Sequence, residues 1–249
     1  MFAHFLAQRL MIEQYPLHFE FRANQTFDDF FAGVNQPIIN DLKQCVLGRG
    51  EQQIFLWAKA GQGKSHLLQA CCQHAQAHEM KSFYFDLARY RLHKPAIFLG
   101  LDDFEVVCVD NVDAITGQKK WEEALCAFMQ RHYERGHRLI IAATHLPNYM
   151  TLSTPNMKTS LSWGLMIQLK TLVDTHSVDA LIFKADAMGF ELSPQVGRFL
   201  MIQHQNDIEG LWKLLEQLDK ASLAAKRKLT VPFLKQLFEI QTESENLAL

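Results

Sequence analysis

The sequence predicts an α/β fold, in which a core with a five-stranded parallel sheet is followed by a small all-helical domain. Up to about residue 172, short apolar strand patterns alternate with longer helical patterns. Strands that alternate with helices imply crossover connections, and crossovers join parallel strands. Beyond about residue 173 the strand patterns stop and only helical patterns follow. A third observation, a glycine-containing loop between the first strand and its helix, is typical of phosphate-binding α/β proteins.

The expected elements follow from apolar spacing and from stop signals. Strands are expected at residues 54–57, 82–87, 105–109, 139–144 and 165–169. Core helices are expected at residues 37–47, 64–78 and 119–135, and the later helices at 175–188, 194–204, 207–226 and 231–240. Ser193 before Pro194 is typical of a helix start. The expected division is an N-terminal segment (1–20), an α/β core (21–172), a helical domain (173–240) and a polar tail (241–249).

The composition excludes several classes of protein. Of 249 residues, 48% are hydrophobic and 21% charged, which is typical of a globular protein. The formal net charge of -2 favours only weak or indirect contact with DNA. The chain has neither a signal-peptide pattern nor an apolar run long enough for a membrane span, so a cytoplasmic protein without membrane contact is expected. The five cysteines have no paired spacing, which favours reduced thiols.

The most informative stretch is WAKAGQGKSHLL at residues 57–68. After a strand and before a helix, Gly61 and Gly63 permit a turn whose backbone N–H groups surround a phosphate. Lys64 adds positive charge, and the Ser65 hydroxyl is a ligand for Mg²⁺. The pattern GxxxxGK[ST] is met except at its first position, which Ala58 occupies. The stretch predicts a nucleotide site, with a plain strand-to-helix turn as the alternative.

The stretch EVVCVDNVD at residues 105–113 supplies the second half of the expected site. Asp110 ends a buried strand pattern, at the sheet edge where α/β proteins bind ligands. We expect Asp110 to hold Mg²⁺ together with Ser65, and Asn111 to lie beside the nucleotide. The alternative is that Asp110 only caps the strand end. An amide such as that of Asn111 cannot act as a general base for an attacking water.

The order of these stretches resembles the DnaA-related AAA+ family, and most closely its Hda branch of DnaA regulatory inactivators. The resemblance runs from about residue 14 to 237 and rests on TFDDFFAG (26–33), GQGKSHLL (61–68), VCVDNVDAI (107–115), LSWG (161–164), GFELSPQVGRFL (189–200) and LEQLDKASLAAKRKLTVPFLKQL (215–237). It implies a P-loop AAA+ core with a helical lid, bound ADP or ATP with Mg²⁺, and DnaA as a partner. Because few residues follow Ile240, a helix-turn-helix DNA-binding domain is not expected in this sequence.

The segment QYPLHF at residues 14–19 resembles peptides that insert into the sliding clamp of DNA polymerase III. The resemblance implies polar contacts from Gln14 and hydrophobic anchors from Leu17 and Phe19. An amphipathic strand packed on the core is the alternative for this segment.

Several positions depart from the family pattern. Ser160 occupies the place of the arginine that completes a neighbouring subunit's site, and Glu209 that of the nucleotide-sensing arginine in the lid. Thr144 is the nearest candidate for the polar sensor after the fourth strand. Because these changes weaken charge stabilisation, slow or absent ATP turnover is expected. Lys158 is a candidate for the missing charge.

Other patterns carry less weight. The aromatic side chains of Phe27, Phe30 and Phe31 line either an adenine pocket or the core. His74 and His78 have helical metal-pair spacing without a third ligand, and the basic run 226–228 is most simply a solvated helix end.

The resemblance implies a negative regulator of replication initiation, which docks on the DNA-loaded clamp and promotes hydrolysis of ATP on DnaA. It would act as a partner of the DnaA ATPase and could form homo-oligomers. The alternatives are an autonomous P-loop ATPase and a DnaA-like adaptor or loader in DNA replication.

Overall fold

The computed structural model describes residues 25–171 and 174–203, together with 210–211, 214–215, 218, 230–232 and 234–235. Five strands form one sheet in the order β2-β3-β4-β1-β5, and all four neighbouring pairs are parallel. The strands are β1 (Gln53–Trp57), β2 (Ser82–Asp86), β3 (Val106–Asp110), β4 (Arg138–Ala143) and β5 (Leu165–Gln168). The predicted α/β fold with a five-stranded parallel sheet is confirmed.

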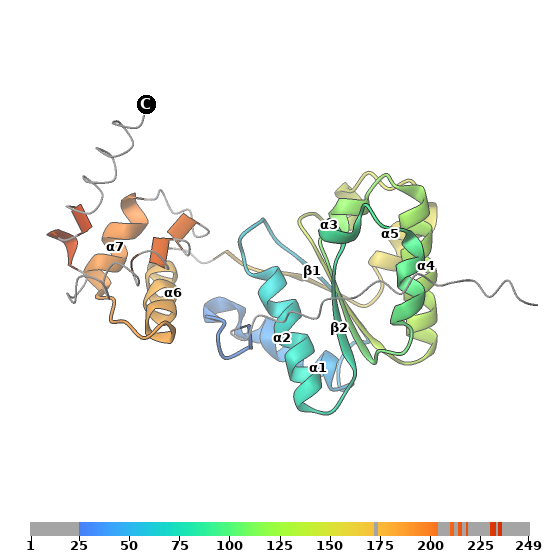
Figure 1. Ribbon diagram of the computed structural model, residues 1–249, viewed down its shortest axis with the longest axis horizontal. Coiled ribbons are helices and arrows are strands. Elements are labelled where there is room, and N and C mark those ends of the chain that lie inside the picture. The colour runs from blue at the N-terminus through green and yellow to red at the C-terminus, as the bar shows by residue number, and fades with distance from the viewer. Residues whose placement is uncertain are drawn as a thin grey trace, which may run out of the picture.

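Helices cover both faces of the sheet, because successive strand residues point to opposite sides. Helices α1 (Gln36–Val46) and α2 (Lys64–Ala77) pack on the face that carries Ile54 and Leu56. Helices α4 (Lys119–Glu134) and α5 (Pro155–Leu161) lie on the opposite side, where Phe55 packs (Figure 1). The result is a three-layer core in which β1, in the sheet's interior, is buried on both faces.

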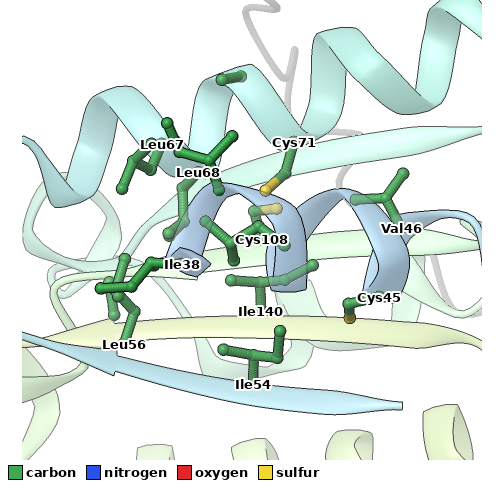
Figure 2. Packing of buried hydrophobic residues seen from close by; sticks show 14 of the residues in the cluster. Ile38, Cys45, Val46, Ile54, Leu56, Leu67, Leu68, Cys71, Cys108 and Ile140 are labelled. Carbon is green, nitrogen blue, oxygen red and sulfur yellow. The ribbon is translucent and has the colours of Figure 1, made fainter. Parts of the chain in front are cut away.

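The layer between the sheet and helices α1 and α2 is lined by aliphatic side chains and thiols. Cys45 of α1, Cys71 of α2 and Cys108 of β3 are fully buried among them (Figure 2). All five cysteines are free, and Cys126 is half-buried while the other four are buried. Thiols here fill space as small apolar groups do.

Up to residue 203, the expected helices and strands agree with the structure to within about two residues at each end. One of these small differences has a clear physical cause. The second strand was expected to reach Leu87, but it ends at Asp86. The Asp86 side chain accepts a hydrogen bond from the backbone N–H of Ala88 at 3.0 Å and so caps a short helix, α3 (Leu87–Tyr90). Because Asp86 caps this helix, Leu87 becomes its first residue and does not extend the strand.

Short helices that the sequence did not predict fill the connections. They are α5 and the 3₁₀ turns η1 (Gly33–Asn35), η2 (Pro95–Leu101), η3 (Val112–Ile115) and η4 (Pro147–Tyr149). Three of these five elements begin with a proline at one of their first two positions, where its missing N–H costs nothing. Each is too short to show a helical apolar period.

Beyond the sheet, α6 (Asp174–Ala187) and α7 (Pro194–Gln203) form a helical unit with its own core (Figure 1). Leu181 and Leu200 are buried there against Leu211, Leu215 and Leu234. The Ser193 hydroxyl accepts a hydrogen bond from the Val196 N–H, so the predicted cap of α7 is confirmed. The helices expected at 207–226 and 231–240 fall largely outside the described residues. In the parts of the chain that the structure describes, no helix is long and apolar enough to cross a membrane.

Candidate nucleotide-binding site

The phosphate loop follows β1 at the C-terminal edge of the sheet. Its start is tied to β4, because the Ala58 N–H donates to the Ala143 carbonyl at 3.3 Å. Gly61 and Gly63 have φ angles of 74° and 93°, in the left-handed region that favours glycine. Gly63 is the N-cap of α2, so the positive end of a 14-residue helix opens directly on the loop. The local geometry is that of an anion-binding turn.

The Lys64 ammonium lies within the loop. Its Nζ donates to the carbonyls of Ala58 at 2.7 Å and Lys59 at 2.9 Å. Burial lowers the pKa of Lys64, while the nearby carboxylates of Asp110 and Asp113 act in the opposite direction. The side chain is only 7% exposed. Because its hydrogen-bond partners are neutral carbonyls, the ammonium keeps a positive charge that can attract a phosphate.

Asp110 is the last residue of β3 and is fully buried. Its carboxylate accepts hydrogen bonds from the Tyr84 hydroxyl at 2.6 Å and from the Asn111 N–H at 2.8 Å. The Ser65 side chain lies close enough to this carboxylate to lower its pKa. Burial raises the pKa of Asp110, and these hydrogen bonds only partly offset the effect. The two residues expected to hold Mg²⁺, Ser65 and Asp110, are therefore brought together.

Asn111 occupies a left-handed conformation with a φ of 54°, which asparagine tolerates better than most residues. Its amide Nδ2 donates to Asp86 Oδ1 at 2.8 Å. Asp86 and Asp110 are register partners on β2 and β3, and the amide bonds the first of these carboxylates. The Asn111 side chain thus links the ends of two neighbouring strands.

The end of β4 contributes a further polar group. The Thr144 N–H donates to Asp113 Oδ2 at 2.6 Å, and His145 Nδ1 lies 3.6 Å from Asp113 Oδ1. Sequence reasoning named Thr144 but missed the roles of Asp113 and Tyr84. Tyr84 lies on β2, and its position beside Asp110 follows from the β2–β3 register, for which the sequence has no local signal.

The three aromatic side chains near residue 30 lie in three different surroundings. Phe27 is buried in the core and contacts the His74 ring, with the centroids 5.7 Å apart. Phe30 lies against the phosphate loop: a Cβ at Gly63 would come within 2.6 Å of its ring. Phe31 lies 5.8 Å from Phe183 of α6, centroid to centroid, and so joins the core to the C-terminal helices.

Helix α5 contains Ser160, the residue that the resemblance places where the family has an arginine. Ser160 is only 9% exposed, and its carbonyl accepts a hydrogen bond from Gln53 Nε2. Lys158 lies on the exposed side of the same helix. The position that departs from the family pattern therefore faces inward, whereas a lysine two residues earlier faces solvent.

Several residues predicted from the sequence lie outside the described residues: Gln14, Leu17, Phe19, Glu209 and the basic run 226–228. His74 and His78 approach each other, with ring centroids 4.5 Å apart. Among the described residues, no group of three or more His, Cys, Asp or Glu side chains is arranged to hold a metal ion.

Comparisons with known proteins show a similar fold and a similar C-terminal domain. The family model described as the lid domain of Hda matches residues 174–238. Domain III of the replication initiation protein DnaA from Thermotoga maritima has a TM-score of 0.75 at 15% identity, covering 86% of this chain and 95% of that one. AMPPCP-bound DnaA from Aquifex aeolicus has a TM-score of 0.64 at 18% identity, covering 81% of this chain and 68% of that one.

The likeness extends to a branch migration motor. The Thermotoga maritima RuvB Holliday junction branch migration motor has a TM-score of 0.65 at 14% identity, covering 87% of this chain and 72% of that one. At such identities the solved structures show the fold alone, whereas the match to the lid domain of Hda concerns residues 174–238. The chain therefore has a DnaA-like fold over most of its length, and its residues 174–238 match the lid domain of Hda.

Proposed function

We propose that the chain is a negative regulator of DNA replication initiation. Docked on the sliding clamp, it would promote hydrolysis of the ATP that is bound to DnaA. The observation that carries this proposal is the combination of an Hda lid domain with a DnaA-like core whose phosphate loop is preformed. The proposal has three parts: a bound nucleotide, a contribution to a partner's site, and a tether to the clamp.

The nucleotide is ADP or ATP with Mg²⁺, held at Gly61, Gly63, Lys64 and Ser65. The residues fit such a ligand, because the loop offers a helix N-terminus and a buried ammonium to phosphate oxygens. Asp110 and Ser65 supply the oxygen ligands that Mg²⁺ prefers. Bound Mg²⁺ would neutralise phosphate charge there. A DnaA structure of similar fold holds AMPPCP, which supports a nucleotide at this loop.

The chain's own site is poorly equipped to hydrolyse ATP. Asn111, which follows Asp110, has an amide that cannot take a proton from water, and this amide is already bonded to Asp86. The bound nucleotide would therefore stabilise the fold and the lid, and catalysis would take place on DnaA.

Lys158 is the residue that we assign to the partner's site. A cation near the transferred phosphate stabilises the charge that develops during hydrolysis. Ser160 cannot provide this charge, and it faces the core. Lys158 is exposed on the same helix and is therefore free to reach a nucleotide on a neighbouring protein.

The tether is the segment that contains Gln14, Leu17 and Phe19. A short extended peptide binds through its main chain, with pockets for alternate side chains. Docking on a clamp that encircles DNA brings the regulator to DNA without a strongly basic surface of its own, consistent with a net charge of -2.

The experiment that tests the proposal is a DnaA ATPase assay with DNA-loaded clamp. ATP-loaded DnaA is mixed with the purified chain, and single-turnover hydrolysis is followed. Wild type should accelerate hydrolysis only when the clamp is present. The triple variant Gln14→Ala, Leu17→Ala, Phe19→Ala should lose both the acceleration and clamp binding. Lys158→Ala should bind the clamp normally but accelerate poorly, whereas the exposed control Lys119→Ala should behave as wild type.

Other outcomes would identify a different function. Turnover without partners that disappears in Lys64→Ala would make the chain an autonomous ATPase. Salt-sensitive DNA affinity in the isolated chain, without any effect on DnaA, would make it a DNA-binding adaptor. Clamp binding with no change in DnaA hydrolysis would reject the regulatory role while retaining the tether.

A further inference from the structure

Helix α5 is held at its N-terminal end by a buried carboxylate. Glu122 of α4 is fully buried. Its carboxylate accepts hydrogen bonds from the backbone N–H groups of Ser153 at 2.9 Å, Thr154 at 2.6 Å and Gly117 at 2.7 Å. Thr154 is the N-cap residue of α5. The residues that lead into the helix are therefore fixed by a side chain from another element.

The C-terminal end of α5 is held by a buried amide. Gln53, the first residue of β1, is 6% exposed. Its Nε2 donates to the carbonyls of Ser160 and Trp163, both at 2.8 Å. The Ser160 carbonyl also accepts a weaker hydrogen bond from the Trp163 N–H at 3.3 Å, so the amide adds a shorter bond from outside the helix. One side chain thus ties the helix end and the following turn to the central sheet.

Between these two ends, one face of the helix packs against the core. Met157 and Leu161 are fully buried, and the Met157 sulfur lies 3.3 Å from the Cys126 sulfur of α4. Asn156, Lys158 and Thr159 are exposed. A helix of only seven residues is marginal on its own, so its orientation depends on these contacts.

We propose that Glu122 and Gln53 are positioning residues, which hold α5 so that Lys158 presents its charge to a nucleotide on a partner protein. This inference rests on the proposed function. A cation that stabilises a developing charge is most effective when its backbone is already fixed, since a displacement of about 1 Å can cost about 100-fold in rate. Two buried polar side chains at the two ends of a short helix provide this fixation.

The test separates positioning from general stability. Gln53→Met keeps the volume of the side chain but removes its donors. In the DnaA hydrolysis assay with DNA-loaded clamp, we expect the maximal accelerated rate to fall at least about 10-fold. The concentration of regulator that gives half of the maximal effect should stay within about threefold of wild type.

The decisive variant combines Gln53→Met with Lys158→Ala. If Gln53 acts through Lys158, the double variant is no slower than Lys158→Ala alone, because the charge that Gln53 positions is already absent. Multiplied losses in the double variant would overturn the inference. Gln52→Met is the matched control: its Nε2 donates to the Tyr133 carbonyl of α4 at 2.8 Å and not to a carbonyl of α5, and its rate should equal that of wild type.

Glu122→Gln tests the other end of the helix and keeps the assay interpretable if Gln53→Met folds poorly. This variant should lower the maximal rate of DnaA hydrolysis, and it should not add to the loss seen in Lys158→Ala. Amide hydrogen exchange should also become faster at Ser162, whose N–H donates to the Lys158 carbonyl. If wild type fails to accelerate DnaA hydrolysis, the proposed function fails. If wild type accelerates and the folded Gln53→Met and Glu122→Gln variants do so equally well, only the positioning role fails.

Discussion

Replacing Gly63 by alanine should destabilise the phosphate loop through two separable effects. The first is the backbone conformation: with a φ of 93°, a residue that carries a Cβ is strained by about 1–2 kcal/mol. The second is contact: the added Cβ would lie 2.6 Å from the Phe30 ring, a distance at which the ring must move. We therefore expect the free energy of unfolding to fall by more than about 2 kcal/mol.

Gly136→Ala isolates the backbone term. Gly136 has a φ of 71°, also in the left-handed region, but nothing lies within 4 Å of its would-be Cβ. Urea unfolding of this variant should show only the loss of about 1–2 kcal/mol. The excess loss in Gly63→Ala then measures the contact with Phe30.

A double variant, Gly63→Ala with Phe30→Ala, closes the cycle. Removing the ring relieves the contact, so the two losses should sum to more than the loss in the double variant by about 1 kcal/mol. Strictly additive losses, or a Gly63→Ala variant as stable as Gly136→Ala, would refute the placement of Phe30 against the loop.

Three further predictions concern titration and close packing. Through His132, wild type should lose about 3 kcal/mol of stability between about pH 7 and pH 4, because burial lowers the pKa of His132 from 6.5 to about 4 and only the unfolded chain takes up the proton in this range. His132→Phe should lack this part of the loss. Asp110→Asn should raise Tm at neutral pH without nucleotide, since burial raises the pKa of Asp110; the gain should vanish as the pH falls toward 3.8, and Mg²⁺-dependent nucleotide binding should weaken. Gly164→Ala should destabilise the fold by about 3 kcal/mol or more, because its Cβ would lie 2.1 Å from the Gln53 carbonyl oxygen.

Each of these has a measurement that decides it. For His132→Phe the comparison is the pH slope of urea unfolding, with the exposed His93→Gln as control. An unchanged slope would contradict the assignment. His66 and His74, whose pKa values are also lowered, retain part of the wild-type slope. A Tm of Asp110→Asn below that of wild type at pH 7 would mean that its hydrogen bonds outweigh the cost of burial. Gly136→Ala also serves as the control for Gly164→Ala.

The core of the fold and half of the site were predictable because they have local signals. The phosphate loop shows a motif at fixed spacing between a strand and a helix, and Asp110 ends an uninterrupted apolar run. Tyr84 carries no such signal, since it meets Asp110 only through the β2–β3 register. Residues that meet across a sheet after 26 positions in the chain cannot be paired from periodicity alone.

Helix α5 was missed for a different reason. It begins with a proline, and only Met157 and Leu161 of its apolar side chains are buried. Its conformation depends on hydrogen bonds with Glu122 and Gln53. These residues lie 32 and 107 positions away in the sequence from the residues of this segment that they bond. Tertiary hydrogen bonds of this kind decide the conformation of short segments, and no propensity scale contains them.

The buried thiols between the sheet and helices α1 and α2 can report when these helices separate from the sheet. Cys45, Cys71, Cys72 and Cys108 have no exposed surface, whereas Cys126 is half-buried. A thiol reagent would therefore label Cys126 first, and the other four only when α1 or α2 separates from the sheet. Helix α2 begins at the phosphate loop and carries Cys71 and Cys72. The change in their labelling rate on addition of nucleotide would therefore measure how far a ligand at the loop stabilises the packing of this helix.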